Sequence, residues 1–198
     1  MIVAQVYFDD IIFRSTKDEL VHDFSKFMQA EFEMSMIGEL NHFLGLQICQ
    51  RESGIIISQS KYAKNLVKKF GLESVNLIRT PMSPNVKLTI DLLGKNVDSS
   101  LYRSMIGSLL YLTTSRADIS YSVEVRAIYQ ANPKESHMIA LKRIIKYVKA
   151  IVDLRVWYSK DTNDVLLGIL MRIGLGILMI EKVHWGVVFM WVIILSPG

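Results

Sequence analysis

The alternation of apolar and polar residues predicts short strands and amphipathic helices over roughly the first 160 positions. β-Branched and aromatic residues at 2–7 and 11–13 flank an acidic pair, which predicts a hairpin with the acids at its turn. Thr16 and Glu19 have the spacing of a capping box, and the apolar residues after them predict a helix to about residue 31. The remaining pattern predicts a hairpin at 41–50 and 54–58, helices at 59–70, 101–114, 119–130 and 134–150, and a strand at 154–158.

The pattern changes near the C-terminus, where Arg172, Glu181 and Lys182 are the only charged residues after position 164. This apolar stretch accounts for most of the positive mean hydropathy, +0.27, of a chain that is 21% charged. Its charges interrupt the run of about 20 apolar residues that a membrane helix requires. With no secretion signal at the start, we expect an intracellular protein that does not enter the membrane.

Composition narrows the class of protein further. A chain of 198 residues with 51% hydrophobic residues and a net charge of +4 can bury a real core, which excludes a disordered tail or a fibrous repeat. The single cysteine, Cys49, excludes a disulfide framework within the chain and a cysteine-based zinc site. We predict four parts: residues 1–76, a linker at 77–99, a helical region at 100–168, and a tail at 169–198. The two prolines and the polar residues at 77–99 are typical of a linker.

The acidic pair Asp9-Asp10 is the sharpest chemical feature. Mg²⁺ prefers carboxylate oxygens and usually binds one or two of them together with substrate phosphates. Neighbouring side chains of a strand point to opposite faces, so at most one of the two projects directly into a given site. The alternative interpretation is structural, because Asp is common in turns for its tolerance of turn geometry.

Two helices carry basic stripes. In the helix predicted at 59–70, a first stripe of lysines lies opposite the apolar residues. In the helix predicted at 134–150, a second stripe of lysines also lies opposite the apolar residues. Such stripes suit phosphate backbones, which are bound without reading the base sequence. A solvated helix face is the alternative. The first stripe comprises Lys61, Lys64 and Lys68, and the second comprises Lys142, Lys146 and Lys149.

Residues 5–13, which read QVYFDDIIF, resemble the Tyr-x-Asp-Asp hairpin of the reverse transcriptases of copia-type long-terminal-repeat retrotransposons. Residues 32–48, with Phe-Leu-Gly-Leu at 43–46, resemble the next block of that family, which contains the primer-grip hairpin. Further blocks follow in the same order at 58–62, 80–82, 102–112 and 132–137, so the resemblance covers roughly residues 1–168.

The resemblance implies an α+β fold, with an incomplete palm hairpin, then thumb and connecting helices, and an irregular apolar tail. It implies Mg²⁺-dependent, template-directed DNA synthesis on an RNA or DNA primer-template with deoxynucleoside triphosphates. Asp9 would be a metal-binding catalytic carboxylate and Asp10 a neighbouring catalytic acid, also placed at the metal, and the lysines of the first stripe would bind nucleic acid. The primer-positioning residues would be His42, Phe43, Leu44, Gly45 and Leu46.

The chain departs from the family pattern in ways that bear on activity. The family requires a third carboxylate from a strand upstream of the hairpin, so we expect no polymerase activity from this chain alone. Arg14 stands where the family usually has Gly, and Ala117 stands in the family's Ser-Arg-Pro-Asp block.

Shifting the reading frame by one base after Gly168 can turn residues 171–177 into Asp-Ala-Asp-Trp-Ala-Gly-Asp, which resembles the start of the family's ribonuclease H domain. We therefore expect an out-of-frame tail. Two alternatives stay open, a non-catalytic nucleic-acid-binding remnant and a membrane-associated protein.

Overall fold

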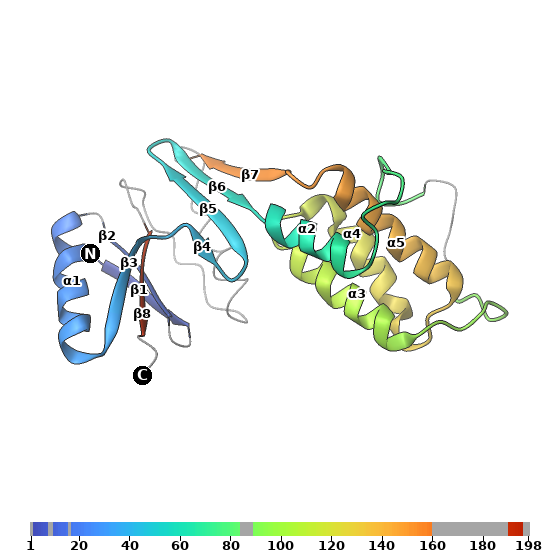
Figure 1. The fold of residues 1–198 in the computed structure, drawn as a ribbon, viewed down its shortest axis with the longest axis horizontal. Helices are drawn as coiled ribbons and strands as arrows, with labels where there is room; N and C mark the ends of the chain where they lie inside the picture. Colours follow the sequence, from blue (N-terminus) through green and yellow to red (C-terminus); the bar gives the residue numbers. More distant parts are fainter. Residues whose placement is uncertain (1, 8–9, 16, 84–88, 160–189, 196–198) are drawn as a thin grey trace. The chain divides into compact units, whose positions relative to one another are not determined.

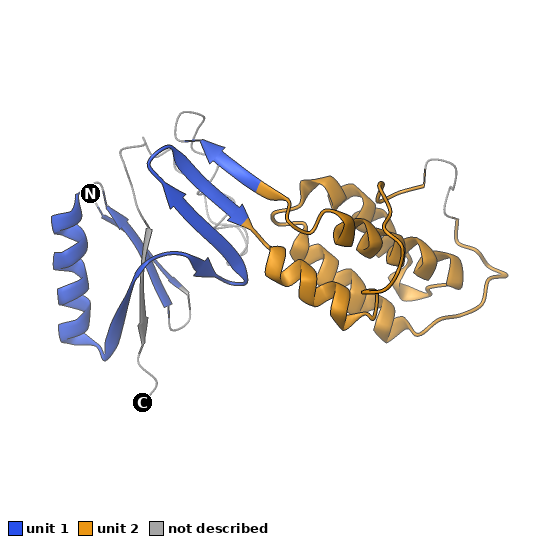
Figure 2. Cartoon of the chain, turned by 45° about the horizontal axis from the view of Figure 1, so that its top comes forward, with its two compact units in different colours: residues 1–57, 156–198 blue, residues 58–155 orange. Residues whose placement is uncertain are grey.

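The computed structural model describes residues 2–7, 10–15, 17–83, 89–159 and 190–195. Figure 1 shows the order of the elements and Figure 2 the two compact units into which the chain divides. Unit 1 comprises residues 1–57 and 156–198, and unit 2 comprises residues 58–155. The division therefore falls just before the first helix of unit 2.

Unit 1 contains a four-stranded sheet with the order β1-β2-β8-β3. The first two strands, β1 (Ile2–Tyr7) and β2 (Asp10–Ser15), form the antiparallel hairpin expected from the sequence. The third, β3 (Met34–Glu39), follows helix α1 (Asp18–Glu31). β8 (Met190–Leu195) lies between β2 and β3 and runs antiparallel to both.

Helix α1 covers one face of this sheet because its apolar residues recur at helical intervals. Val21 is buried and Phe24 and Met28 are half-buried, in one cluster with Ile11 and Phe13 of β2. The rings of Phe13 and Phe24 have their centroids 4.9 Å apart. The two β3 residues of the same cluster are Met34 and Met36.

A second sheet of unit 1 has the order β4-β5-β6-β7. It is built from β4 (His42–Phe43), β5 (Leu46–Arg51), β6 (Gly54–Ser58) and β7 (Arg155–Ser159). Its buried residues form a cluster of their own, against which Ile12 of β2 also packs. That cluster, called here the hairpin core, comprises Leu40, Phe43, Leu46, Ile48, Ile55 and Ile57.

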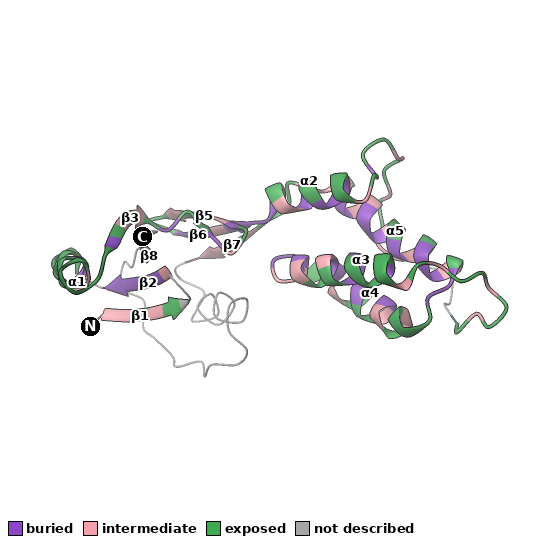
Figure 3. Cartoon of the chain, turned by 60° about the horizontal axis from the view of Figure 1, so that its bottom comes forward, coloured by how far each residue is buried: buried purple, intermediate pink, exposed green. Residues whose placement is uncertain are grey.

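Unit 2 is a helical bundle with a continuous apolar core, and Figure 3 shows the buried residues on the inward sides of its helices. Its helices are α2 (Ser60–Lys69), α3 (Ser99–Leu112), α4 (Ala117–Ala127) and α5 (Glu135–Ala150), with a short 3-10 helix, η1 (Ile128–Ala131). Asp98 caps α3 by accepting hydrogen bonds from the backbone N–H groups of Ser100 and Leu101.

Two predictions differ from the structure. Helix α1 begins at Asp18 with Lys17 at the cap and no side-chain cap hydrogen bond, so the helix start predicted at Thr16 and Glu19 is not the one observed. Residues 190–195 of the expected irregular tail form a strand, because an uncharged run of β-branched and aromatic residues suits a sheet interior. Of the remaining tail, 169–189 and 196–198 lie outside the described residues. In the part of the chain that the structure describes, no helix is long and apolar enough to cross a membrane.

Candidate active site and nucleic-acid interface

The acidic pair sits where β1 turns into β2. Asp10 is the first residue of β2 and pairs with Tyr7 of β1 and Ile194 of β8, with its side chain half-buried. Asp9 lies outside the described residues. Because Ile11 and Phe13 pack toward α1, strand alternation places Asp10 and Ile12 on the opposite face of the sheet.

That face of β2 contacts the hairpin core through Ile12. The structure therefore places Asp10 on the side of the first sheet that meets the core beneath the predicted primer-positioning residues. Asp10 and the predicted primer-positioning residues, which begin 32 positions later at His42, belong to one unit. Sequence reasoning did not foresee this contact.

The residues that could hold a metal ion are few in the described part of the chain. No group of three or more His, Cys, Asp or Glu side chains gathers there closely enough to form a metal site. The donor set of Asp10 and its sequence neighbour suits one Mg²⁺ ion that is bound mainly through substrate phosphates, since such sites use one or two protein carboxylates. The Mg²⁺ expectation for Asp9 and Asp10 stays a prediction.

The predicted primer-positioning residues form a tight turn between β4 and β5. Phe43 pairs with Leu46, and the two residues between them have positive φ angles, 47° at Leu44 and 75° at Gly45. Two consecutive left-handed residues are the pattern of a type I′ hairpin turn. The apolar pattern predicted one continuous strand at 41–50 and missed this turn, whereas the resemblance implied a hairpin at 42–46.

One side of the turn packs on the hairpin core and the other side is exposed. Phe43 and Leu46 are buried in the hairpin core, and Leu44 packs against that core from its half-buried position. The left-handed conformation is costly for a Leu, and the packing of its side chain offsets part of that cost. His42 and Gly45 are exposed, so the turn presents an imidazole and a bare backbone segment to solvent.

The first basic stripe is exposed on α2. Lys61, Lys64 and Lys68 all point to solvent, whereas Leu66 of the same helix is buried in the core of unit 2. Lys64 Nζ lies 3.7 Å from a carboxylate oxygen of Asp153, but both side chains are more than 60% exposed, so this pair is weak. The predicted face is thus present, with its charges accessible.

The end of α2 follows the predicted glycine cap. Gly71 has φ 64°, its N–H donates to the Lys68 carbonyl at 3.0 Å, and the N–H of Leu72 donates to the Val67 carbonyl at 3.0 Å. This pair of bonds is a Schellman motif, and both Leu72 and Val67 lie in the core of unit 2. The motif holds the last turn of the lysine-bearing helix in place.

The second stripe is less suited to binding. Lys142 is exposed, but Lys149 donates through Nζ to the Val75 carbonyl at 2.8 Å and is half-buried. The Lys149 ammonium therefore fastens the segment after α2 to the end of α5. This is a structural role, which neither the nucleic-acid interpretation nor the alternative of a solvated helix face predicted for Lys149.

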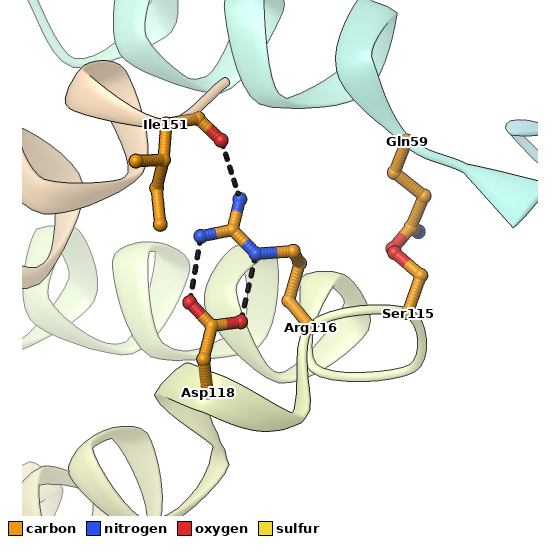
Figure 4. Close-up of polar contacts among 5 residues, drawn as sticks. All are labelled: Gln59, Ser115, Arg116, Asp118 and Ile151. Atoms are coloured by element: carbon orange, nitrogen blue, oxygen red, sulfur yellow. Dashed lines mark hydrogen bonds and ion pairs between the residues drawn. The ribbon is translucent and has the colours of Figure 1, made fainter. Parts of the chain in front are cut away.

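A polar network in unit 2 was missed by sequence reasoning (Figure 4). Arg116 donates from Nε and Nη2 to the two carboxylate oxygens of Asp118, at 2.8 and 2.9 Å, and from Nη1 to the Ile151 carbonyl at 3.2 Å. Beside it, the hydroxyl of Ser115 donates to Gln59 Oε1 at 2.6 Å. The network joins the start of α2, the α3–α4 connection and the end of α5.

Its members shift one another's pKa. Burial by itself would raise the pKa of the Asp118 carboxyl, but the hydrogen bonds and charge of Arg116, with a hydrogen bond from Tyr147, hold it below its ordinary value. Burial and the Asp118 carboxylate raise the pKa of Tyr147. The sequence feature that could have indicated this network was the Ser115–Asp118 block, which resembles the family's Ser-Arg-Pro-Asp. Ala117, which replaces the Pro of that block, is the first residue of α4, a position that accepts Pro or Ala.

Comparison with known proteins agrees with the motifs. A family model described as "Reverse transcriptase (RNA-dependent DNA polymerase)" matches residues 1–84. The Retrovirus-related Pol polyprotein from transposon RE1 of Arabidopsis thaliana is 34% identical over 158 residues, which are 80% of this chain and 11% of the polyprotein. An uncharacterized mitochondrial protein of Arabidopsis thaliana is 31% identical over 80% of this chain and 65% of its own length.

A third relative, the Retrovirus-related Pol polyprotein from transposon TNT 1-94 of Nicotiana tabacum, is 25% identical over 75% of this chain and 12% of the polyprotein. The chain thus spans about a tenth of the length of these polyproteins. No solved structure matches it significantly. Residues 1–84 belong to the reverse transcriptase family, and the relationship to the Pol polyproteins of copia-type retrotransposons extends over about four-fifths of the chain.

Proposed function

We propose that this chain is a primer-template-binding portion of a retrotransposon reverse transcriptase, that it contributes Asp9 and Asp10 to RNA-directed DNA synthesis, and that it does not carry out that synthesis alone. The observation that carries the proposal is the exposed face of α2, where Lys61, Lys64 and Lys68 stand clear of the core within a chain related to reverse transcriptases. A folded helix with three exposed lysines along one side suits a sugar-phosphate backbone.

Each group has a distinct part in the proposed function. The α2 lysines would neutralise phosphates without reading bases, which a polymerase that copies any template requires. The tight turn at Leu44-Gly45 would support the primer strand with His42 and exposed backbone. Mg²⁺, held by Asp9 and Asp10, would supply positive charge at the phosphates during phosphoryl transfer. The inability to act alone is supported by the sequence, which offers two adjacent carboxylates where the parent site is expected to use three.

Binding is tested with a labelled RNA–DNA primer-template hybrid at a series of salt concentrations. We expect affinity to fall with salt. The triple variant Lys61→Ala, Lys64→Ala, Lys68→Ala should reduce the slope of log affinity against log salt by about one for each phosphate that the protein no longer neutralises. The matched control removes three exposed lysines elsewhere, Lys17, Lys26 and Lys95.

If the two triple variants weaken binding equally, the α2 face is not the interface and only the net charge matters. Circular dichroism of each variant checks that α2 still forms. Primer extension is measured separately, on the same hybrid with Mg²⁺ and deoxynucleoside triphosphates. Extension above a buffer blank, abolished by Asp10→Asn, would overturn the claim that the chain is inactive alone.

A further inference from the structure

Helix α4 carries a buried guanidinium in its last turn. Arg126 is 3% exposed and lies on the inward side of α4, where Ile119, Ser122 and Val123 are also buried. Two of its nitrogens, Nε and Nη1, are buried, and neither has a hydrogen-bond partner among the residues that the structure describes. An arginine stays charged in proteins, and a buried donor left unpaired destabilises the fold. The described residues thus supply the donors at this position without an acceptor for them.

The groups around Arg126 do not neutralise its charge. Burial lowers the pKa of Arg126, and three nearby phenols partly offset this fall. They belong to Tyr102, Tyr129 and Tyr121. A phenol is neutral at physiological pH, because its ordinary pKa is about 10. No carboxylate of the described residues is among the groups that shift the pKa of Arg126, whereas Arg116 in the same unit has Asp118 as its partner.

The backbone that carries this guanidinium is held in place. The hydroxyl of Tyr102 donates to the Arg126 carbonyl at 2.8 Å, and Arg103 Nε donates to the Gln130 carbonyl at 3.2 Å. These two bonds fasten the end of α4 and the 3-10 helix η1 to the start of α3, which lowers the ordering cost of binding a ligand there. The helix dipole favours a cation in the last turn of α4, but it supplies no acceptor to Nε or Nη1.

We propose that Arg126 is the centre of a binding site for a small oxyanion, phosphate or carboxylate, within unit 2. A guanidinium matches the oxygens of both anions in geometry and charge. Because Arg126 is 3% exposed, the site suits an anion of few atoms. The lysines of the proposed nucleic-acid interface on α2 are exposed, so the two sites are distinct. Binding pairs donors that are otherwise buried unpaired, and the anion therefore stabilises the folded state.

Thermal melts of the full chain test for this site. Unfolding is followed by far-ultraviolet circular dichroism in sodium phosphate, sodium acetate or sodium chloride at equal ionic strength and neutral pH. We expect the midpoint to rise with the concentration of an oxyanion and not with that of chloride, as a ligand bound only to the folded state requires. Phosphate should give the larger shift, because it carries more charge than acetate. Equal melts in the three salts would overturn the proposal and indicate that water pairs the donors.

Variants separate the site from general salt effects, because phosphate also stabilises proteins by its exclusion from their surface. Arg126→Met removes the donors and the unpaired charge, so it should melt above the wild type in chloride and lose the oxyanion-specific shift. Arg126→Lys keeps the charge without the Nε donor and should weaken the apparent affinity about tenfold. The matched control is Arg103→Met, because Arg103 is exposed and its Nε already donates to a carbonyl.

The same melts distinguish this site from the α2 face. The triple variant at Lys61, Lys64 and Lys68 should keep the shift. A shift that persists in Arg126→Met, or that Arg103→Met removes as fully, contradicts the proposal. A shift lost only in the triple variant would place the anion on α2, which overturns this site and leaves the proposed nucleic-acid interface intact. If Arg126→Met does not fold, Arg126→Lys decides, since an unchanged affinity in that variant would show that the guanidinium donors take no part.

Discussion

Replacing Asp118 by Asn removes the charge that faces Arg116 and keeps the shape of the side chain. The Arg116 side chain is 2% exposed and that of Asp118 27% exposed, and the two share bonds of 2.8 and 2.9 Å. Removing one partner of a buried pair typically costs about 3–5 kcal/mol, because the other charge stays buried. Since water reaches Asp118 in part and Arg116 keeps its bond to Ile151, we expect a loss of about 2–3 kcal/mol in the free energy of unfolding.

Asp153→Asn is the matched control, because Asp153 faces Lys64 in the same unit at 3.7 Å with both side chains largely exposed. The same chemical change should cost less than about 1 kcal/mol there. Urea denaturation followed by far-ultraviolet circular dichroism measures both, since most of the helices lie in unit 2. Equal losses for the two variants would refute the reasoning that burial of Arg116 determines the cost.

Three further predictions concern unit 2. The pKa of Asp118 is lowered in the folded protein, so its contribution to stability is present above the ordinary carboxyl pKa and is lost as pH falls through the folded pKa. Acid titration below about pH 4 should therefore unfold the wild type more steeply than Asp118→Asn. A Cβ would meet nothing within 4 Å at Gly71 or at Gly107, so backbone conformation determines the effect of Ala at both. In thermal melts, Gly71→Ala should lower the free energy of unfolding by about 1 kcal/mol because of its φ of 64°, and Gly107→Ala inside α3 should raise it by about 0.5–1 kcal/mol. Tyr102→Phe removes a buried 2.8 Å hydrogen bond to the Arg126 carbonyl and should lower the free energy of unfolding, measured in urea, by about 1–2 kcal/mol. Burial raises the pKa of Tyr102 to about 12, so spectrophotometric titration of the wild type should show a phenol that ionises at unusually high pH.

Local periodicity explains why the helices could be predicted. The helix expected at 59–70 is observed as α2 (Ser60–Lys69), because its buried residues recur every three to four positions and Gly71 stops it. The Asp-Asp hairpin was predictable for a similar reason, since its two apolar strands are adjacent in sequence. The lysines of α2 followed from the helix itself, because the apolar positions determine which side remains exposed.

Contacts between distant segments could not be predicted in this way. Arg116 reaches Ile151, 35 residues away, and no pattern in either segment announces the other. The apolar pattern did not show the turn at Leu44-Gly45, because Leu is a poor residue for positive φ and its presence there reflects tertiary packing on the hairpin core. Only the resemblance implied a hairpin at these positions. The catalytic interpretation of Asp9 rests on the resemblance alone, because Asp9 lies outside the described residues.

The strand at 190–195 and the expected out-of-frame tail are compatible. A reading-frame shift would replace residues selected for one fold by a run that was never selected for any. Pairing in a sheet asks little of such a run beyond an extended backbone, β-branched or aromatic side chains and the absence of charge, and Met190–Leu195 meets these conditions by composition. The hydrogen-bonding edges of β2 and β3 pair with this segment through its backbone, so an unselected sequence can occupy the centre of the sheet. The frame shift itself is decided by the coding DNA, where an open ribonuclease H frame one base away is expected.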